Sequence, residues 1–207
     1  YFDAQRRMAY INLPEIYGLY EKELFSKNAV DFDNILLMAR NLLRDYPEVQ
    51  QQYQSLFSYL LVDEYQDSNN LQEELTRLLI GNGNLFCVGD DWQAIYGFRG
   101  SNVDHFIQFA DNYDGAKIFR LEQNYRSSEE IVHTANELIR FNKNRVKKEC
   151  YSQKDGGLIE VHDFYSDDEE AAWVARKIEW LNHDGIRYED MAVLYRTKFC
   201  SLSFEKR

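Results

Sequence analysis

Hydrophobic positions along the chain form two uninterrupted runs that each lead into polar residues. The run 59–62 has no polar alternation and is followed directly by the carboxylates Asp63 and Glu64. Such a run is typical of a strand buried on both faces of a parallel sheet. The run 84–88 is a second strand of this kind, and the loop after it contains Gln93. Because open α/β sheets bind ligands at the carboxyl ends of their strands, we expect these three polar side chains to lie close together.

The rest of the pattern alternates further strands with helices. Strands are predicted at 116–121, 158–165 and 191–195, and the pair Gly156-Gly157 is the clearest break in the chain. This alternation indicates βαβ units, so the predicted fold class is α/β with parallel sheets. Helices are predicted within 1–28, from Asp31 or Asp33 to Pro47, over 48–56, from Ser68 or Asn69 to Gly81, over 104–113, from Ser127 with Glu130 as a capping box to Asn142, and from Ser166 to Leu181.

Composition narrows the class of protein. The 207 residues suffice for one large domain or two small ones, and the 44% hydrophobic content supports a buried core. No apolar run approaches the roughly 20 residues that cross a bilayer, and the start of the chain lacks a signal-peptide pattern. Three separated cysteines and four histidines without ligand spacing argue against disulfides and zinc. We therefore expect a cytoplasmic protein without membrane association. The net charge of −11 disfavours nucleic-acid binding by the whole surface, although binding uses local patches.

The carboxylates after the first strand suit nucleotide hydrolysis. Asp63 would hold Mg²⁺, and Glu64 would orient and deprotonate the attacking water. The alternative is a strand that ends in a solvated acidic turn, and this stretch alone favours neither reading. The Gln93 amide can hydrogen-bond a terminal phosphate or the attacking water, and so sense whether the phosphate is present.

Aromatic and arginine side chains follow the second and third predicted strands. Tyr96 and Phe98 lie in a glycine-rich loop beside Arg99, a combination that forms a stacking platform for single-stranded bases. The alternative is a pair of core aromatics under the loop, but the clustering favours exposure. Tyr125 could stack on a base. Arg126 suits a phosphate because its planar fork donates two bonds, with a structural salt bridge as the alternative.

Four motifs occur in a fixed order and spacing, at 31–33, 62–69, 88–100 and 121–128, with a weaker one at 192–197. Together they resemble the motifs of superfamily 1 DNA helicases of the UvrD/Rep/PcrA type. That family often has Trp where Phe98 stands and Ser where Ala94 stands. Neither difference removes the chemistry, because Phe still stacks.

The resemblance implies an ATP-driven motor that moves 3′ to 5′ on single-stranded DNA and separates duplexes at junctions. By that likeness Asp63 binds Mg²⁺, Glu64 is the catalytic base, and Gln93 couples the γ-phosphate to the DNA site. Tyr125 would stack on the adenine and Arg126 would contact the γ-phosphate. The implied DNA contacts are Tyr96, Phe98 and Arg99.

The implied fold comprises parts of two RecA-like lobes of the P-loop NTPase type. Residues 1–28 resemble the end of an inserted helical subdomain, 29–120 the second half of the first lobe, and 121–207 the start of the second lobe. ATP would bind in the cleft between the lobes, with Arg126 near the hinge. None of the ten glycines is followed by lysine, so the phosphate loop of such motors is not in this sequence. We expect the chain to be a fragment that is catalytically silent by itself.

Other functions remain open at this stage. One is a non-catalytic module that binds single strands or a partner, and another is the motor part of a helicase–nuclease subunit. A metal-dependent hydrolase using Asp63, Glu64 and Asp67 is a weaker alternative, because it explains neither Gln93 nor Arg126.

The sequence also leaves the pathway (repair, replication restart or plasmid replication), the protein partners and the oligomeric state open. Basic residues within 139–148 form a patch that could contact DNA, although a solvated helix end is favoured by about two to one.

Overall fold

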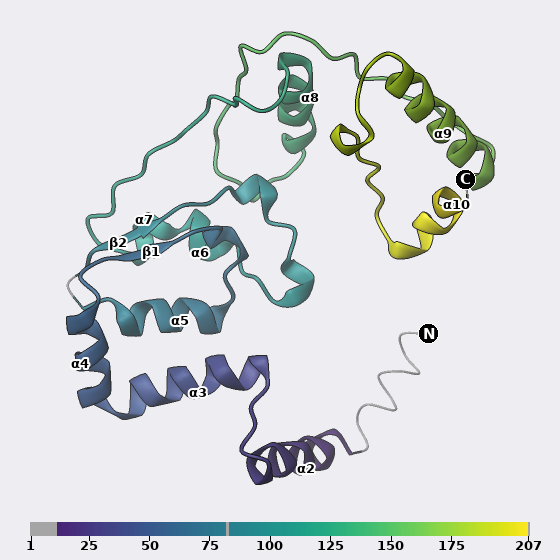
Figure 1. Ribbon diagram of the computed structural model, residues 1–207. Coiled ribbons are helices and arrows are strands. Elements are labelled where there is room, and N and C mark those ends of the chain that lie inside the picture. The colour runs from purple at the N-terminus through teal and green to yellow at the C-terminus, as the bar shows by residue number, and fades with distance from the viewer. Residues whose placement is uncertain (1–11, 82, 207) are drawn as a thin grey trace. The chain divides into compact units, whose positions relative to one another are not determined.

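The chain folds as two compact units. A computed structural model describes residues 12–81 and 83–206, so residues 1–11 of the predicted helix within 1–28 lie outside the described part. The first unit comprises Tyr1–Asn124 and Thr134–Tyr151, and the second comprises Tyr125–His133 and Ser152–Arg207. Helices and a small sheet form the first unit, and helices with extended connections form the second (Figure 1). In the described residues, no helix has both the length and the apolar character needed to cross a membrane.

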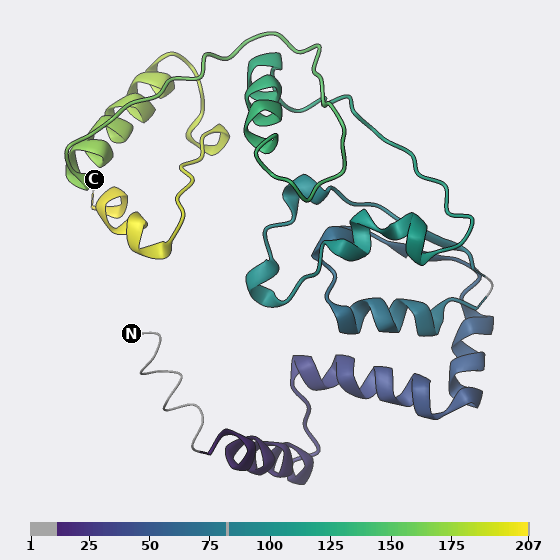
Figure 2. The same ribbon diagram turned by 180° about the vertical axis from the view of Figure 1, so that it is seen from behind.

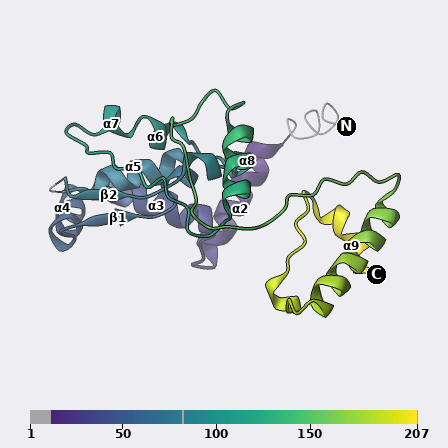
Figure 3. The same ribbon diagram turned by 90° about the horizontal axis from the view of Figure 1, so that it is seen from above.

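The two strands predicted before the polar loops are present and pair in parallel. Strand β1 (Leu60–Val62) pairs with β2 (Leu85–Cys87), and the two lie side by side in Figures 1 and 3. The prediction that both faces are buried is wrong, because the partners Leu61 and Phe86 are 71% and 58% exposed. Partnered residues of a parallel pair point to the same side, and no second layer covers that side among the described residues. The sheet is therefore half-covered.

Helices before and between the strands follow the predicted boundaries closely. The Asp31 carboxylate accepts the Asn34 backbone N–H at 2.7 Å, and Asn69 forms a reciprocal capping box with Gln72. Pro47 begins the helix after the one that it was predicted to end. Helix α3 packs along α5, and α5 lies next to the strands (Figures 1 and 2). The bounds are α2 Leu13–Ser26, α3 Phe32–Asp45, α4 Pro47–Leu56 and α5 Asn70–Leu79.

Gly81 follows the last turn of α5, as predicted, and allows α4 to approach. A Cβ at this position would lie 2.7 Å from the Cβ of Gln54. The Gln54 side-chain amide donates to the Leu78 carbonyl at 2.8 Å, which satisfies an acceptor at the end of α5. The glycine therefore serves close packing of two helices.

Two expectations for the segment after β2 are corrected by the structure. Residues 104–113 form two short helices, α6 (Asp104–Ile107) and α7 (Phe109–Asn112), in place of one. Residues 116–121 are extended but form no strand, and Phe119 and Leu121 are 80% and 92% exposed. Figure 1 shows this segment as an unpaired chain after α7. An apolar run becomes a strand only where another strand offers its backbone groups, and none in the described residues does so here.

A buried cluster holds the turn after β1. The hydroxyl of Tyr65 donates to the carboxylate of Glu73, and the hydroxyl of Tyr113 donates to the same carboxylate at 2.9 Å. Arg77 pairs with Glu73 at 2.8 Å, so this carboxylate, in a residue only 4% exposed, is fully engaged. The Tyr65 ring also meets Phe109 edge-on, with centroids 5.7 Å apart. Burial and the Glu73 hydrogen bond raise the pKa of Tyr113 to about 12.

The second unit is built on one long helix. Helix α9 (Asp167–His183) begins as predicted after Ser166, whose hydroxyl accepts the Glu169 N–H at 3.2 Å. The predicted strands at 158–165 and 191–195 are extended segments without strand partners among the described residues, for the reason given for 116–121. The remaining elements are α8 Glu129–Ile139, which is shared between the units, α10 Ser201–Glu205, and the 3₁₀ turns Tyr65–Asp67, Asp91–Gln93, Gly97–Arg99, Tyr188–Asp190 and Lys198–Cys200.

Helix α8 begins one residue later than predicted. Its first residue is Glu129, and the Val132 N–H donates to the Ser128 carbonyl at 3.1 Å. Ser128 therefore occupies the N-cap position that the predicted capping box gave to Ser127.

Candidate functional site

The polar turn after β1 places Glu64 in a strained backbone conformation. Glu64 has φ of 49°, in the left-handed region that side chains other than glycine rarely adopt. The Tyr65 N–H donates to the Val88 carbonyl at 2.9 Å, which continues the pairing of β1 with β2 into the turn. Residues held in this conformation persist only where their surroundings fix them, and they concentrate at functional sites.

Gln66 connects this turn to the loop after β2. Its side chain is fully buried at 1% exposure, and its Nε2 donates to Glu64 Oε2 at 2.8 Å. Its Oε1 accepts the backbone N–H of Asp90 at 2.9 Å. Gly89 makes this approach possible, because a Cβ there would lie 2.5 Å from Gln66 Oε1 and 2.8 Å from the Phe106 ring. The two predicted motifs are therefore joined through one buried amide.

Gln93 is held by the same loop. Its Nε2 donates to Asp90 Oδ2 at 2.8 Å, and the Trp92 backbone N–H donates to Asp90 Oδ1 at 3.0 Å. Burial works to raise the pKa of Asp90, but the hydrogen bonds from Lys148 and Gln93 outweigh it and lower that pKa below its usual range. Asp90 is therefore the anion around which the Gln93 loop is organised.

Lys148 contradicts both readings of the basic segment 139–148. Its ammonium donates to Asp90 Oδ1 at 2.5 Å and to Asp91 Oδ1 at 2.9 Å. Its side chain is only 12% exposed, and that of Asp91 is 1% exposed. Lys148 also lies over the Trp92 ring, 4.8 Å from its centroid. This lysine is therefore neither a solvated helix end nor an open DNA contact, although other basic residues of the segment, such as Lys147, are exposed.

The aromatic loop is exposed, as its clustering predicted. Phe98 is 76% exposed and Tyr96 is 37% exposed. Their ring centroids are 6.0 Å apart, and the Arg99 guanidinium lies 5.2 Å from the Tyr96 ring and 5.5 Å from the Phe98 ring. The loop turns through the short 3₁₀ helix Gly97–Arg99, and Gly100, which follows that helix, has φ of 86°. An exposed pair of rings beside a cation is a surface on which bases can stack.

One cavity of about 570 Å³ brings the carboxylate, the amide and an aromatic together. Glu64, Gln93 and Tyr96 all line it. The two side chains expected to act on a phosphate therefore share a cavity with one expected to contact DNA. The full lining is Glu64, Gln66, Asp67, Trp92, Gln93, Ile95 and Tyr96.

The donor set around the turn fits Mg²⁺ bound together with phosphates. Asp63 is exposed, and its Oδ1 accepts the Glu64 N–H at 2.9 Å. Oδ1 of Asp67 is buried without a hydrogen-bond partner in the described part of the chain. Burial and the neighbouring charge of Glu64 raise the pKa of Asp67. No cluster of three metal-ligating side chains occurs in that part, and Mg²⁺ commonly takes one or two carboxylates with phosphate oxygens.

Tyr125 and Arg126 belong to the second unit, where backbone contacts fix their segment. Tyr125 is 79% exposed, and Arg126 is also exposed. The Lys154 ammonium donates to the Arg126 carbonyl at 3.0 Å, and the Ser152 hydroxyl donates to the Ser127 carbonyl at 2.7 Å. Side chains of Ser152 and Lys154 therefore fix the main chain of this motif, while the side chains of Tyr125 and Arg126 are exposed.

Comparison with known proteins decides the family. A family model described as the UvrD/REP helicase N-terminal domain matches residues 3–114, which is more than half of the chain. The chain belongs to the UvrD/REP helicase family. A second model, the UvrD-like helicase C-terminal domain, matches residues 119–207 of this UvrD/REP helicase chain.

Curated relatives of this UvrD/REP helicase chain are named as DNA helicases. It is 38% identical over 193 residues to an ATP-dependent DNA helicase PcrA of Staphylococcus epidermidis strain RP62A, a match that covers 92% of the chain and 26% of the relative. The same values hold for an ATP-dependent DNA helicase PcrA of Staphylococcus aureus strain Mu50. The chain thus spans about a quarter of the length of the curated relatives that it matches.

Sequence reasoning missed two residues of this UvrD/REP helicase site. Gln66 was given no role and Lys148 was assigned only to the basic segment 139–148, yet the two side chains bond Glu64, Asp90 and Asp91. A signal existed for the first, because Gln66 lies inside the motif at 62–69. For Lys148 the only signal in the sequence is the adjacent carboxylate pair Asp90-Asp91, and its need for a cation follows from the burial of Asp91, which only the structure shows.

Proposed function

We propose that this chain is part of an ATP-dependent DNA helicase that translocates 3′ to 5′ on single-stranded DNA and separates duplexes at junctions. In this proposal the two units are parts of two RecA-like lobes. The hydrogen-bonded connection from Glu64 through Gln66 and Asp90 to Gln93 carries the proposal. It links a carboxylate suited to activate water with an amide suited to sense a phosphate, in a cavity that Tyr96 also lines.

The residues of the first unit would divide the hydrolytic work. Bound MgATP supplies the phosphoryl bond that is broken. Asp63 would hold the Mg²⁺, and Glu64 would accept a proton from the attacking water. Gln93 would hydrogen-bond the water or the terminal phosphate with its amide. Its anchor Asp90 fixes the direction in which that amide points.

The remaining candidates would bind the two ligands. Tyr125 would stack on the adenine, and Arg126 would donate two hydrogen bonds to the γ-phosphate. Tyr96 and Phe98 would stack on bases, with the Arg99 cation beside both rings as an electrostatic contact to DNA.

ATP hydrolysis with and without single-stranded DNA tests this function. It is measured on the 207-residue chain and on a protein that extends the chain to the length of its relatives. We expect DNA-stimulated turnover only in the extended protein. Glu64→Gln should lower that turnover by about 10²–10⁴-fold, because the amide cannot accept the proton. Glu48→Gln, an exposed carboxylate in the first turn of α4, is the matched control.

The outcomes separate the proposed function from its alternatives. An extended protein that binds single-stranded DNA without hydrolysing ATP would make the chain part of a binding module. Hydrolysis that survives Glu64→Gln would remove Glu64 from the mechanism. DNA-stimulated turnover by the 207-residue chain alone would contradict the expectation that this chain is catalytically silent.

A further inference from the structure

We propose that Lys148 is a positioning residue for Gln93 and that it acts through the Asp90 carboxylate. The inference rests on the proposed role of Gln93 in hydrolysis. Lys148 itself lines no part of the cavity that Glu64 and Gln93 share.

The two oxygens of Asp90 serve different partners. Oδ1 accepts from the Lys148 ammonium at 2.5 Å and from the Trp92 N–H at 3.0 Å. Oδ2 accepts from the Gln93 amide at 2.8 Å. A carboxylate rotates as one plane, so a cation that fixes Oδ1 also fixes the direction in which Oδ2 receives Gln93. Lys148 therefore controls where the Gln93 amide lies without touching it.

Asp91 keeps the ammonium in place. Its Oδ1 accepts from Lys148 at 2.9 Å, and its side chain is only 1% exposed. The Lys148 ammonium also lies over the Trp92 ring, which adds a contact of the cation with the aromatic face. A lysine with two carboxylates and a ring around it has one accessible position, so it can transmit a fixed geometry to Asp90.

The backbone around Lys148 has hydrogen bonds besides those of its ammonium, although one of them also goes to Asp91. The Val146 N–H donates to Asp91 Oδ2 at 2.7 Å, and the Trp92 indole donates to the Val146 carbonyl at 3.4 Å. Further along, the Asn136 amide donates to the Cys150 carbonyl at 2.6 Å. Removal of the ammonium should therefore leave the segment in place, while Asp90 Oδ1 keeps only the Trp92 N–H and the carboxylate can rotate more freely.

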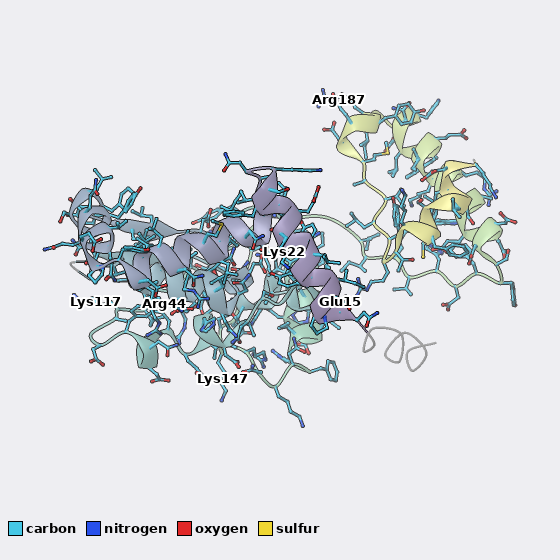
Figure 4. All side chains as sticks on the ribbon, turned by 90° about the horizontal axis from the view of Figure 1, so that it is seen from below. Glu15, Lys22, Arg44, Lys117, Lys147 and Arg187 are labelled. Atoms are coloured by element: carbon cyan, nitrogen blue, oxygen red, sulfur yellow. The ribbon has the colours of Figure 1, made fainter. Side chains whose placement is uncertain are left out.

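The test is a kinetic comparison of Lys148→Met with Lys147→Met in the extended protein. Lys147 is the adjacent lysine, is exposed, and lies at the edge of the first unit in Figure 4. We expect Lys148→Met to lower the DNA-stimulated kcat by about tenfold, since a misplacement of about 1 Å can cost roughly a hundredfold. The KM for ATP should change by less than about twofold, because Gln93 acts on the transition state more than on ground-state binding. Lys147→Met should match the wild type.

Rescue and a double-mutant cycle separate positioning from a general loss of stability. Lys148→Arg keeps the cation and should retain kcat within about threefold of the wild type, because it still pairs with both carboxylates. In a Gln93→Ala background, Lys148→Met should lower kcat by less than about twofold further, since it has no amide left to position. A purely structural role would give losses that multiply.

The possible outcomes distinguish failure of the proposed function from failure of the proposed role of Lys148. A wild-type protein without DNA-stimulated hydrolysis would overturn the proposed function itself. A wild-type protein that hydrolyses ATP, with Lys148→Met as active as Lys147→Met or with losses that multiply in the cycle, would overturn only the role of Lys148. If Lys148→Met melts below the assay temperature, the cycle is run with Lys148→Gln, which keeps a donor to Asp90, and multiplied losses there count equally against the proposal.

Discussion

Two regions that line the same cavity are built in opposite ways. The first, here called the fixed region, is the turn after β1 with the start of the loop after β2. Its Gln66 and Asp91 side chains are 1% exposed and hydrogen-bonded to partners far away in sequence. In the aromatic loop, Phe98 is 76% exposed and contacts its own neighbours in sequence. The fixed region suits chemistry, where small displacements are costly. The exposed region suits binding of a flexible strand, which needs ring faces more than fixed positions.

The strongest test of the comparison breaks the fixed region at its centre. Gln66→Leu keeps the side-chain size but removes the three hydrogen bonds of the buried amide, with Glu64, Asp67 and Asp90, and it leaves the Asp90 N–H without its acceptor. We expect the free energy of unfolding to fall by about 1–3 kcal/mol, the usual range for a buried unsatisfied group. Urea denaturation measures it. Gln51→Leu, an exposed glutamine in α4, should change it by less than about 0.5 kcal/mol. Equal effects of the two substitutions would show that the region is not fixed by Gln66.

Substitutions in the exposed aromatic loop should weaken DNA binding and leave the stability of the fold unchanged. Phe98→Ala should weaken single-stranded DNA binding by about 1–3 kcal/mol, the range for one stacked base. The melting temperature should stay unchanged, because the ring is 76% exposed. Fluorescence anisotropy with a labelled oligonucleotide at fixed salt measures the affinity. Phe119→Ala removes another exposed ring outside the loop and is the control. If this control loses as much affinity for single-stranded DNA as Phe98→Ala, the loop has no special role in binding.

Low pH should destabilise the fixed region more than the aromatic loop, because only the fixed region contains the Asp90 and Lys148 pair. The pKa of Asp90 is lowered, so its stabilisation is present above its unfolded pKa of about 4 and is lost as the pH falls through the lower folded value. The pKa of Lys148 is raised, because its hydrogen bonds to both carboxylates outweigh burial. Its contribution is therefore fully present below its unfolded pKa of about 10.4 and is lost as the pH rises through the higher folded value.

The size of the acid effect is set by exposure. Because the Asp90 side chain remains 33% exposed, we expect the pair to contribute on the order of 1 kcal/mol. Denaturation between pH 3 and pH 7 should show a smaller acid loss in Lys148→Met than in Lys147→Met. Parallel pH profiles in the two variants would count against the pair.

The smallest expected effect concerns the shape of the aromatic loop. Gly100 has φ of 86° and Gly97 does not lie in that region, although a Cβ added to either would meet no atom within 4 Å. Gly100→Ala should therefore destabilise by about 1 kcal/mol through backbone strain alone. Gly97→Ala should be neutral or slightly stabilising. The same denaturation experiment compares them, and an equal response would mean that the turn does not depend on the glycine conformation.

Most of the local features predicted from the sequence are confirmed, although the capping box at Ser127 and the single helix over 104–113 are not. Asp31 and Asn69, each predicted as one of two candidate caps, and Ser166 accept the backbone amide three residues later. A window of four residues therefore contains the whole interaction. The strands β1 and β2 were predicted for a similar reason, because their apolar runs lead directly into polar turns. Their pairing is parallel, as expected.

The predictions for three strands and for Lys148 failed because these features depend on partners that the hydrophobic pattern of the sequence does not specify. The segments 116–121, 158–165 and 191–195 have strand-like composition, but no neighbouring strand pairs with them in the described residues. The prediction for Lys148 was wrong because its role depends on a contact with Asp90, which lies 58 residues away in the sequence. Hydrophobic periodicity reports which face of an element is apolar, and it contains no information on which distant charge will meet a lysine.

The pairing of Lys148 with Asp90 and Asp91 also sets an order of events during protein synthesis. Asp91 emerges from the ribosome 57 residues before the lysine that neutralises it. At about 5–20 residues per second, that interval lasts roughly 3–11 s. Throughout it the nascent chain carries an unpaired acidic turn in a unit that still lacks the end of Thr134–Tyr151. The first unit thus completes its fold only after the opening residues of the second, Tyr125–His133, have been translated.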